Sequence, residues 1–209
     1  MTLSLPPRPG VKLLPLFSGM ALVLVGLAIA LPAEAHHLMA LTHLAPTPLT
    51  GFLSGLAHPI LGPDHLLFLC ALALVGPQRW APWLLAFLAA GLLGSVIGLV
   101  VPGLPMAEAG VAFSLVLVAL VWMNRWPRLL LLPAFALHGY VLSGSVIGWS
   151  HGPLVFYALG LLLCQGALLM VAFTLLRTFA EGLSSQRRAM IAAGLIGCGA
   201  AWTWSALVA

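Results

Sequence analysis

The sequence has 209 residues, of which 62% are hydrophobic and only 6% are charged, and its mean hydropathy is +1.15. This composition excludes a soluble domain, which needs a charged surface, and predicts an all-α polytopic membrane protein. The formal net charge of +4 comes from eight Lys and Arg against four Asp and Glu. So few basic residues do not make a nucleic-acid surface, so we expect the lipid bilayer, and no nucleic acid, as a partner.

The N-terminal segment has the parts of a signal peptide. Two basic residues precede an apolar run over residues 13–31, and residues 32–35 (PAEA) have the small-x-small pattern of a signal peptidase site. We predict a signal peptide over residues 1–35, cleaved after Ala35, and a membrane domain over residues 36–209. The alternative is an uncleaved first transmembrane helix. In either case residue 36 lies outside.

Six further apolar segments follow, each near the ~20 residues that a membrane-spanning helix needs. They cover residues 51–76, 80–101, 105–123, 128–149, 153–177 and 187–208. Pro and Gly mark short connections between them, and the longest predicted loop runs from Thr178 to Gln186. The predicted fold is a signal peptide followed by a bundle of six transmembrane helices.

Basic residues fall only on alternate connections. Starting outside at residue 36, the connections on the opposite side hold every Lys and Arg of the mature chain. Together with the inner flank of the signal peptide, the basic residues are Arg8, Lys12, Arg79, Arg125, Arg128, Arg177, Arg187 and Arg188. By the positive-inside rule we predict an integral protein of the cytoplasmic (inner) membrane, with the mature N-terminus and the C-terminus both outside.

Cysteines and small residues inside the segments are interpreted as packing features. Cys70, Cys164 and Cys198 each lie in an apolar run without CxxC spacing, so we expect small buried hydrophobic side chains. Small residues let helices approach closely. They include Gly91, Gly94, Gly98, Gly194, Gly197 and Gly199.

The stretch HPILGPDH places three metal-competent side chains, His58, Asp64 and His65, inside the first mature segment. An ionisable group in the bilayer is costly unless it is paired or bound to a cation, so such residues mark functional sites. Pro59 and Pro63, with a glycine between them, predict that this first mature helix is broken at Pro59–Pro63 and restarts at Pro63. Transporters use broken helices of this kind for ion sites.

Other polar groups are expected at a similar depth, in the outer half of the membrane. His138 lies near the middle of the fourth mature segment, Glu108 begins the third, and His151 follows the fourth in an outer loop. His36 and His37 would begin the mature chain. These ligands suit Ni²⁺, Co²⁺ or Zn²⁺ better than Mg²⁺ or Ca²⁺. Taken singly, His138 could be a core histidine, Glu108 a partner of the helix dipole, and the others solvated residues.

The order of these residues resembles a known family. His58, five residues and then Asp64-His65, after a signal peptide that ends just before a histidine, resembles the first-helix motif of the HupE/UreJ family of nickel and cobalt permeases. The helix count and the short loops agree with that family, as does an acidic residue after a Pro-rich turn at Glu108.

A second motif of the family is present in part. Its approximate form, Phe-His-Gly-x-Ala/Val-His-Gly-x-Glu, aligns with the stretch LHGYVLSGS, in which His138, Gly139 and Val141 match. The second histidine is replaced by Leu142, and the glutamate is replaced by Gly144 or Ser145.

The resemblance implies a permease domain over residues 36–209 that takes up nickel or cobalt. The expected metal ligands are His58, Asp64, His65 and His138, with Glu108 contributing. Ni²⁺ or Co²⁺ would be the transported ion, Zn²⁺ is a third candidate, and no prosthetic group or enzymatic activity is expected. By family resemblance the ion would be delivered to assembly of a nickel hydrogenase or urease, or to cobalamin synthesis. No GxxxxGK[ST] loop for ATP is present in this sequence.

Two other functions remain open at the level of sequence. One is an intramembrane zinc-dependent hydrolase in which Asp64 or Glu108 activates a water molecule. In a variant of this function, a serine near His138, either Ser143 or Ser145, is the nucleophile. The other is a non-transporting metal-binding accessory protein that uses the outer histidines.

Overall fold

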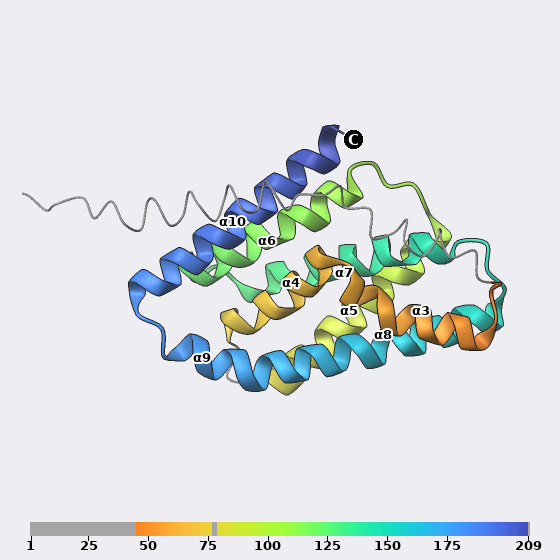
Figure 1. The fold of residues 1–209 in the computed structure, drawn as a ribbon, viewed down its shortest axis with the longest axis horizontal. Helices are drawn as coiled ribbons and strands as arrows, with labels where there is room; N and C mark the ends of the chain where they lie inside the picture. The colour runs from red at the N-terminus through yellow and green to blue at the C-terminus, as the bar shows by residue number, and fades with distance from the viewer. Residues whose placement is uncertain (1–44, 77–78, 209) are drawn as a thin grey trace, which may run out of the picture.

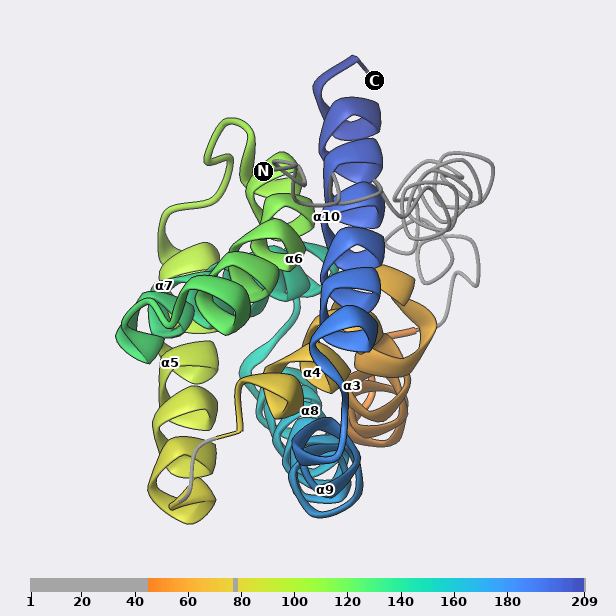
Figure 2. The same ribbon diagram turned by 90° about the vertical axis from the view of Figure 1, so that its left-hand side faces the viewer.

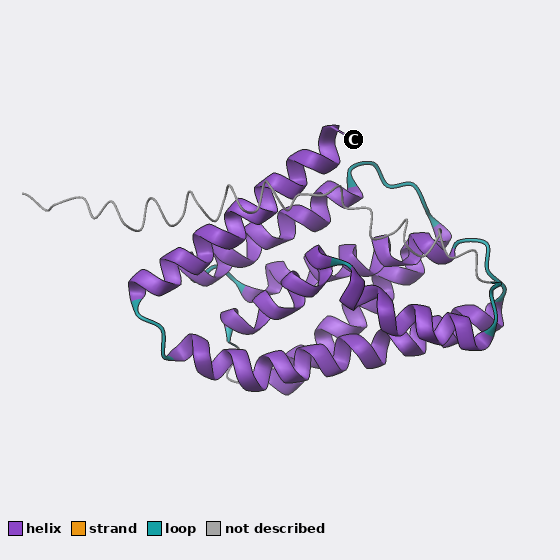
Figure 3. Cartoon of the chain, viewed as in Figure 1, coloured by secondary structure: helices purple, strands orange, loops and turns teal. Residues whose placement is uncertain are grey.

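The computed structural model describes residues 45–76 and 79–208, and within these ranges the chain forms helices and loops without strands (Figure 3). The predicted signal peptide and the pair His36 and His37 lie outside the described residues. The α-helices are α3 (Pro48–Leu61), α4 (Pro63–Leu72), α5 (Trp80–Val100), α6 (Ala107–Asn124), α7 (Leu131–Leu142), α8 (His151–Val171), α9 (Arg177–Glu181) and α10 (Ser185–Val208). Shorter turns extend them: the 3₁₀ helices η1 (Ala73–Val75), η2 (Arg128–Leu130) and η3 (Ser143–Val146), and the π-helical turn η4 (Ala172–Leu176).

The described helices include candidate spans at five of the six predicted places, and a bent pair of helices stands at the first. Five helical runs are long and apolar enough to cross a membrane, and α3 with the α4–η1 run adds a sixth if this bent pair counts as one span. The runs are Trp80–Val100, Ala107–Asn124, Arg128–Val146, His151–Glu181 and Ser185–Val208. The apolar pattern of the sequence is therefore sufficient to locate the helices of the bundle.

The first described pair of helices, α3 and α4, is bent at a break, and the break lies at Gly62. The axes of α3 and the α4–η1 run differ by 72°. Pro59 remains inside α3, whereas Pro63 is the first residue of α4. Gly62 donates its N–H to the carbonyl of His58 at 3.1 Å, and its own carbonyl accepts from Leu66 at 2.9 Å. Gly62 thus ends one helix and starts the next, and Pro63 occupies the position where its missing N–H costs no hydrogen bond.

The predicted loop from Thr178 to Gln186 is wrong. The helical run that begins at His151 continues through η4 and α9 to Glu181, and α10 begins at Ser185, so only residues 182–184 connect them. Arg177 Nε donates to Glu181 Oε1 at 2.9 Å, four residues along the helix. An ion pair at this spacing supports one more helical turn, so polar residues here extend the helix beyond its apolar part.

Helices far apart in sequence pack closely at glycines. A Cβ added at Gly55 of α3 would overlap the backbone of α8 at Tyr157, and one at Gly94 of α5 would overlap the backbone of α7 at Ala136. Gly199 of α10 similarly faces α6. Figures 1 and 2 show the resulting pairs, α3 along α8 and α10 along α6, with α4 in the middle of the bundle. The small residues of the sequence are packing positions, as expected.

The prediction of buried cysteines is confirmed for Cys164 and only partly met by Cys70 and Cys198. Cys164 is buried, Cys70 and Cys198 are half-buried, and all three are free thiols. They lie in helices α8, α4 and α10, respectively.

Candidate functional site

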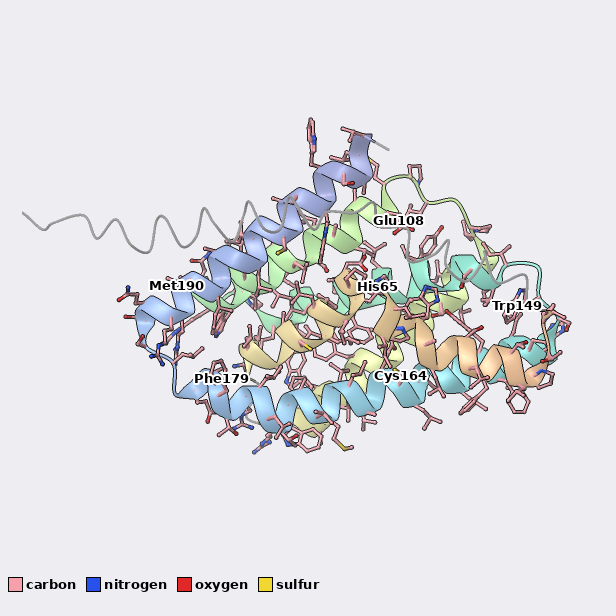
Figure 4. All side chains as sticks on the ribbon, in the orientation of Figure 1. His65, Glu108, Trp149, Cys164, Phe179 and Met190 are labelled. Carbon is pink, nitrogen blue, oxygen red and sulfur yellow. The ribbon has the colours of Figure 1, made fainter. Side chains whose placement is uncertain are left out.

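The break in the first span brings its polar residues into the interior of the bundle. His58 lies in the last turn of α3, four residues before Gly62, while Asp64 and His65 lie in the first turn of α4. Their exposed fractions are 1%, 5% and 2%, and that of His138 on α7 is 3%. Figure 4 shows His65 inside the bundle, between the end marked by Met190 and the end marked by Trp149.

The imidazoles of His58, His65 and His138 lie one beside the next, and we refer to this row as the histidine stack. The ring centroids of His58 and His65 lie 6.2 Å apart with an angle of 20° between the planes. Those of His65 and His138 lie 4.8 Å apart, edge to face. Phe68 of α4, fully buried, stacks on His138 with the ring centroids 4.0 Å apart. The structure thus brings together four residues that the sequence predicted as a site: His58, Asp64, His65 and His138.

The hydrogen bonds of His58 define which of its nitrogens carries the proton. Its Nδ1 lies 3.0 Å from the hydroxyl of Tyr157, and that hydroxyl donates its proton to the carbonyl of Leu142 at 2.7 Å. A hydroxyl has one proton to donate, so Nδ1 must be the donor to Tyr157. Ser145 Oγ, 3.4 Å from Nδ1, also donates to Leu142. The lone pair of His58 is therefore on Nε2.

The same reasoning applies to His138. Its Nε2 lies 2.8 Å from Ser114 Oγ, and Ser114 donates its proton to the carbonyl of Val111 at 2.6 Å. Nε2 of His138 is therefore the donor, and the lone pair is on Nδ1.

His65 is oriented by its neighbour in the chain. Its Nδ1 lies 3.0 Å from Asp64 Oδ1. An ionised carboxylate only accepts hydrogen bonds, so Nδ1 donates and the lone pair of His65 is on Nε2. Asp64 thereby serves His65 as an orienting partner, in addition to any direct contact with an ion.

This arrangement is the one that metal-binding histidines commonly have, in which one ring nitrogen donates to an oxygen and the other can bind the ion. Within residues 45–76 and 79–208, however, no group of three or more His, Cys, Asp or Glu side chains is arranged to hold a metal ion. Two imidazole nitrogens that share an ion lie only about 3–4 Å apart, since each is roughly 2.0–2.1 Å from it. The rings would have to turn or move closer to share one ion.

The other predicted candidates have different positions. Glu108 is in the first turn of α6, as expected, and lines a cavity of 280 Å³ together with Tyr140 and Val141 of α7. Val141 is three residues after His138, so this cavity shares a helix with the histidine stack. His151 is not in a loop: it is the exposed first residue of α8.

Comparison with known proteins identifies the family. A model of the family described as HupE / UreJ protein matches residues 20–202. The chain belongs to the HupE/UreJ family. This family is associated with nickel or cobalt transport and with accessory roles for urease and hydrogenase, and it is not known for enzymes. No curated protein and no solved structure matches the chain.

The partial second motif of this HupE/UreJ protein lies directly beside the histidine stack. Leu142, at the position of the second histidine, is fully buried, and its carbonyl accepts the hydrogen bonds of Tyr157 and Ser145. Ser145 is one of the two positions that align with the glutamate of the family motif, and it contacts His58. Ser145 therefore borders the candidate site.

Sequence reasoning missed Tyr157 and Ser114, the oxygens that orient His58 and His138. Tyr157 is 99 residues from His58 and Ser114 is 24 residues from His138, so no local spacing connects them. The available signal was chemical, because a hydroxyl inside an apolar segment needs a hydrogen-bond partner. Nothing in a single sequence says which partner it finds.

Proposed function

We propose that this HupE/UreJ protein is a permease that moves a divalent transition metal ion, nickel or cobalt, across the cytoplasmic (inner) membrane. The ion would bind to His58, Asp64, His65 and His138 on its way through the bundle. The observation that carries the proposal is that three buried, adjacent imidazoles each donate one N–H to an oxygen, which leaves the other ring nitrogen with a lone pair.

The chemistry of this donor set favours a borderline cation. Imidazole nitrogen suits Ni²⁺, Co²⁺ and Zn²⁺, whereas Mg²⁺ and Ca²⁺ prefer a set of oxygens. Asp64 contributes a negative charge that partly compensates the ion inside the bilayer. Glu108, in its cavity beside α7, would provide a second carboxylate on the path to the histidines. Delivery to a nickel enzyme or to cobalamin synthesis would follow uptake.

Radiometal uptake tests the proposal. We expect Asp64→Asn and His138→Ala to lower the rate of ⁶³Ni²⁺ or ⁵⁷Co²⁺ uptake by about tenfold or more, the usual effect of losing a metal ligand or its orienting partner. His151→Ala is the matched control, because His151 is exposed at the start of α8, and its uptake should equal that of the wild type. Competition among Ni²⁺, Co²⁺ and Zn²⁺ gives the preferred ion.

Uptake that survives Asp64→Asn and His138→Ala would contradict the proposal. Loss of a lipid or peptide product without loss of uptake would instead support the zinc-dependent hydrolase.

A second candidate function, a non-transporting metal-binding accessory protein, has one observation in its favour. The carboxylate of the second family motif is replaced beside His58 by Ser145, and the three imidazoles are not arranged around a common ion. An accessory protein would bind metal at equilibrium, lose that binding in Asp64→Asn, and show no uptake in the wild type.

A further inference from the structure

A second cavity, of 690 Å³, lies at the end of the bundle where α6 finishes and α10 begins, and none of the histidine-stack residues lines it. Four guanidinium groups line it, from four places in the sequence: Arg125, Arg128, Arg177 and Arg188. Figure 1 shows α9 and the start of α10 together at this end, and Figure 4 marks it with Phe179 and Met190.

The charge of this cavity is strongly unbalanced. Among the described residues that line it, Glu181 is the sole carboxylate, and it is paired with Arg177 through a 2.9 Å ion pair. Arg128 donates to the carbonyl of Gly76 and Arg188 to the carbonyl of Glu181, both at 3.4 Å. Neither acceptor is a carboxylate, so the four guanidinium groups that line the cavity share one carboxylate.

Arg188 adds a more specific observation. Its Nε atom is buried and has no hydrogen-bond partner among the residues that the structure describes. A buried N–H without an acceptor is costly, and a turn of the guanidinium group toward the cavity would let a bound anion supply one.

The residue type also points to a phosphate. The positive-inside rule is satisfied equally by Lys and Arg, yet the single lysine of the sequence is Lys12, and every basic residue beyond it is an arginine. The planar guanidinium binds phosphate through two parallel hydrogen bonds, which an ammonium group cannot do.

The rim of the cavity places it at the surface of the bilayer. Three tryptophans, which favour the membrane–water interface, line it: Trp83, Trp122 and Trp126. Leu129, 65% exposed, is also on the rim and is available to acyl chains. Basic cavities between helices at this level bind the headgroups of anionic lipids.

We propose that this arginine cavity binds the phosphate group of an anionic phospholipid. The lipid would sit with its headgroup among Arg125, Arg128 and Arg188 and with its chains along Leu129, joining the α6–α7 connection to α10.

Native mass spectrometry of the full chain, purified in detergent with equal amounts of phosphatidylglycerol and phosphatidylcholine, tests this site. We expect the wild type to retain phosphatidylglycerol in preference. In the double variant Arg125→Gln/Arg188→Gln, the ratio of retained phosphatidylglycerol to retained phosphatidylcholine should fall about fivefold or more, in line with the contribution of an arginine near an anionic headgroup. The control Arg79→Gln/Arg187→Gln removes the same charge from arginines that do not line the cavity, and should keep the preference.

An equal loss in both double variants, or no preference in the wild type, would overturn the proposal. Inorganic phosphate is the second probe: if it raises the melting temperature of the wild type but not of Arg125→Gln/Arg188→Gln, while phosphatidylglycerol has no effect, the cavity takes a soluble phosphate and the lipid assignment is wrong. Arg188→Lys against Arg187→Lys repeats the test with the charge retained, in case the double variant does not fold. Arg188→Lys, which removes a guanidinium group from the cavity, should then weaken retention of phosphatidylglycerol, whereas Arg187→Lys should not.

Discussion

At the scale of single residues, the hydroxyl groups around the histidine stack have two tasks. Tyr157 and Ser114 each donate their proton to a backbone carbonyl and each accept an N–H from an imidazole. Because the hydroxyl proton is already used, the imidazole cannot take the opposite tautomer without losing a buried hydrogen bond, which costs roughly 1–3 kcal/mol. Two hydroxyls thus decide which nitrogens can reach a metal ion.

We predict that Tyr157→Phe weakens metal binding without removing a proposed ligand. The variant retains the aromatic ring beside His58 but removes the hydroxyl that fixes the tautomer of the His58 imidazole. We expect the affinity for Co²⁺ to fall about tenfold, as when the orienting partner of a metal-binding histidine is lost. Binding of Co²⁺ to the purified protein, followed by calorimetry and by the absorption of the bound ion, measures this effect.

Tyr140→Phe is the matched control for that experiment, since Tyr140 is the only other tyrosine of the sequence. Its hydroxyl binds backbone groups of Leu104 and Val101, both at 2.8 Å, and so holds the α5–α6 connection. Equal losses of Co²⁺ affinity in the two variants would contradict a specific role of Tyr157 in orienting His58.

At the scale of elements, the position of His58 depends on how closely α3 approaches α8. Gly51 and Gly55 of α3 and Gly160 of α8 leave no room for a Cβ between the two backbones. This close approach allows Tyr157 on α8 to reach His58 on α3. The break at Gly62 then turns the chain so that Asp64 and His65 meet His138 on α7.

We therefore predict that Gly55→Ala destabilises the protein and disturbs the site together. The added methyl group would overlap the backbone of Tyr157, and overpacking of this kind costs about 1–3 kcal/mol. The melting temperature in detergent should fall, and Co²⁺ affinity should fall with it. Gly152→Ala is the control, because nothing lies within 4 Å of a Cβ at Gly152, and alanine favours the helix. A melting temperature unchanged in Gly55→Ala would show that α3 and α8 separate readily.

The elements and the contacts between them differ in how far sequence predicts them. Apolar runs place the spans to within a few residues, because the bilayer fixes helix length, and Pro63 places the restart of the broken helix. The end of α9 was not predicted, since Arg177 and Glu181 look like loop residues until they pair across one helical turn. The role of Tyr157 was not predicted either, because it depends on the packing of α3 against α8. Local rules define elements, whereas tertiary contacts define the site.

At the scale of the whole molecule, the charges are separated along the bundle. The described arginines lie in or beside every second connection between the helices, and Glu108 and His151 lie beside the connections in between. With the arginine cavity facing the cytoplasm, as the positive-inside rule predicts, a cation would reach Glu108 and the histidines from outside and leave toward the arginines. The positive end would repel a bound cation unless an anion, such as the proposed lipid phosphate, covers it.

This orientation leads to a prediction about the driving force. An inside-negative potential of about 100 mV favours a divalent cation inside by ~4.6 kcal/mol, twice the value for a single charge, which corresponds to a roughly two-thousandfold accumulation without ATP. In proteoliposomes with a potassium gradient, valinomycin should accelerate ⁵⁷Co²⁺ uptake when it makes the interior negative and suppress uptake when it makes the interior positive. Liposomes with Asp64→Asn should respond to neither. Uptake that ignores the potential but requires a pH gradient would mean that the ion exchanges for protons, in which case the histidine stack would have to carry those protons as well as the metal.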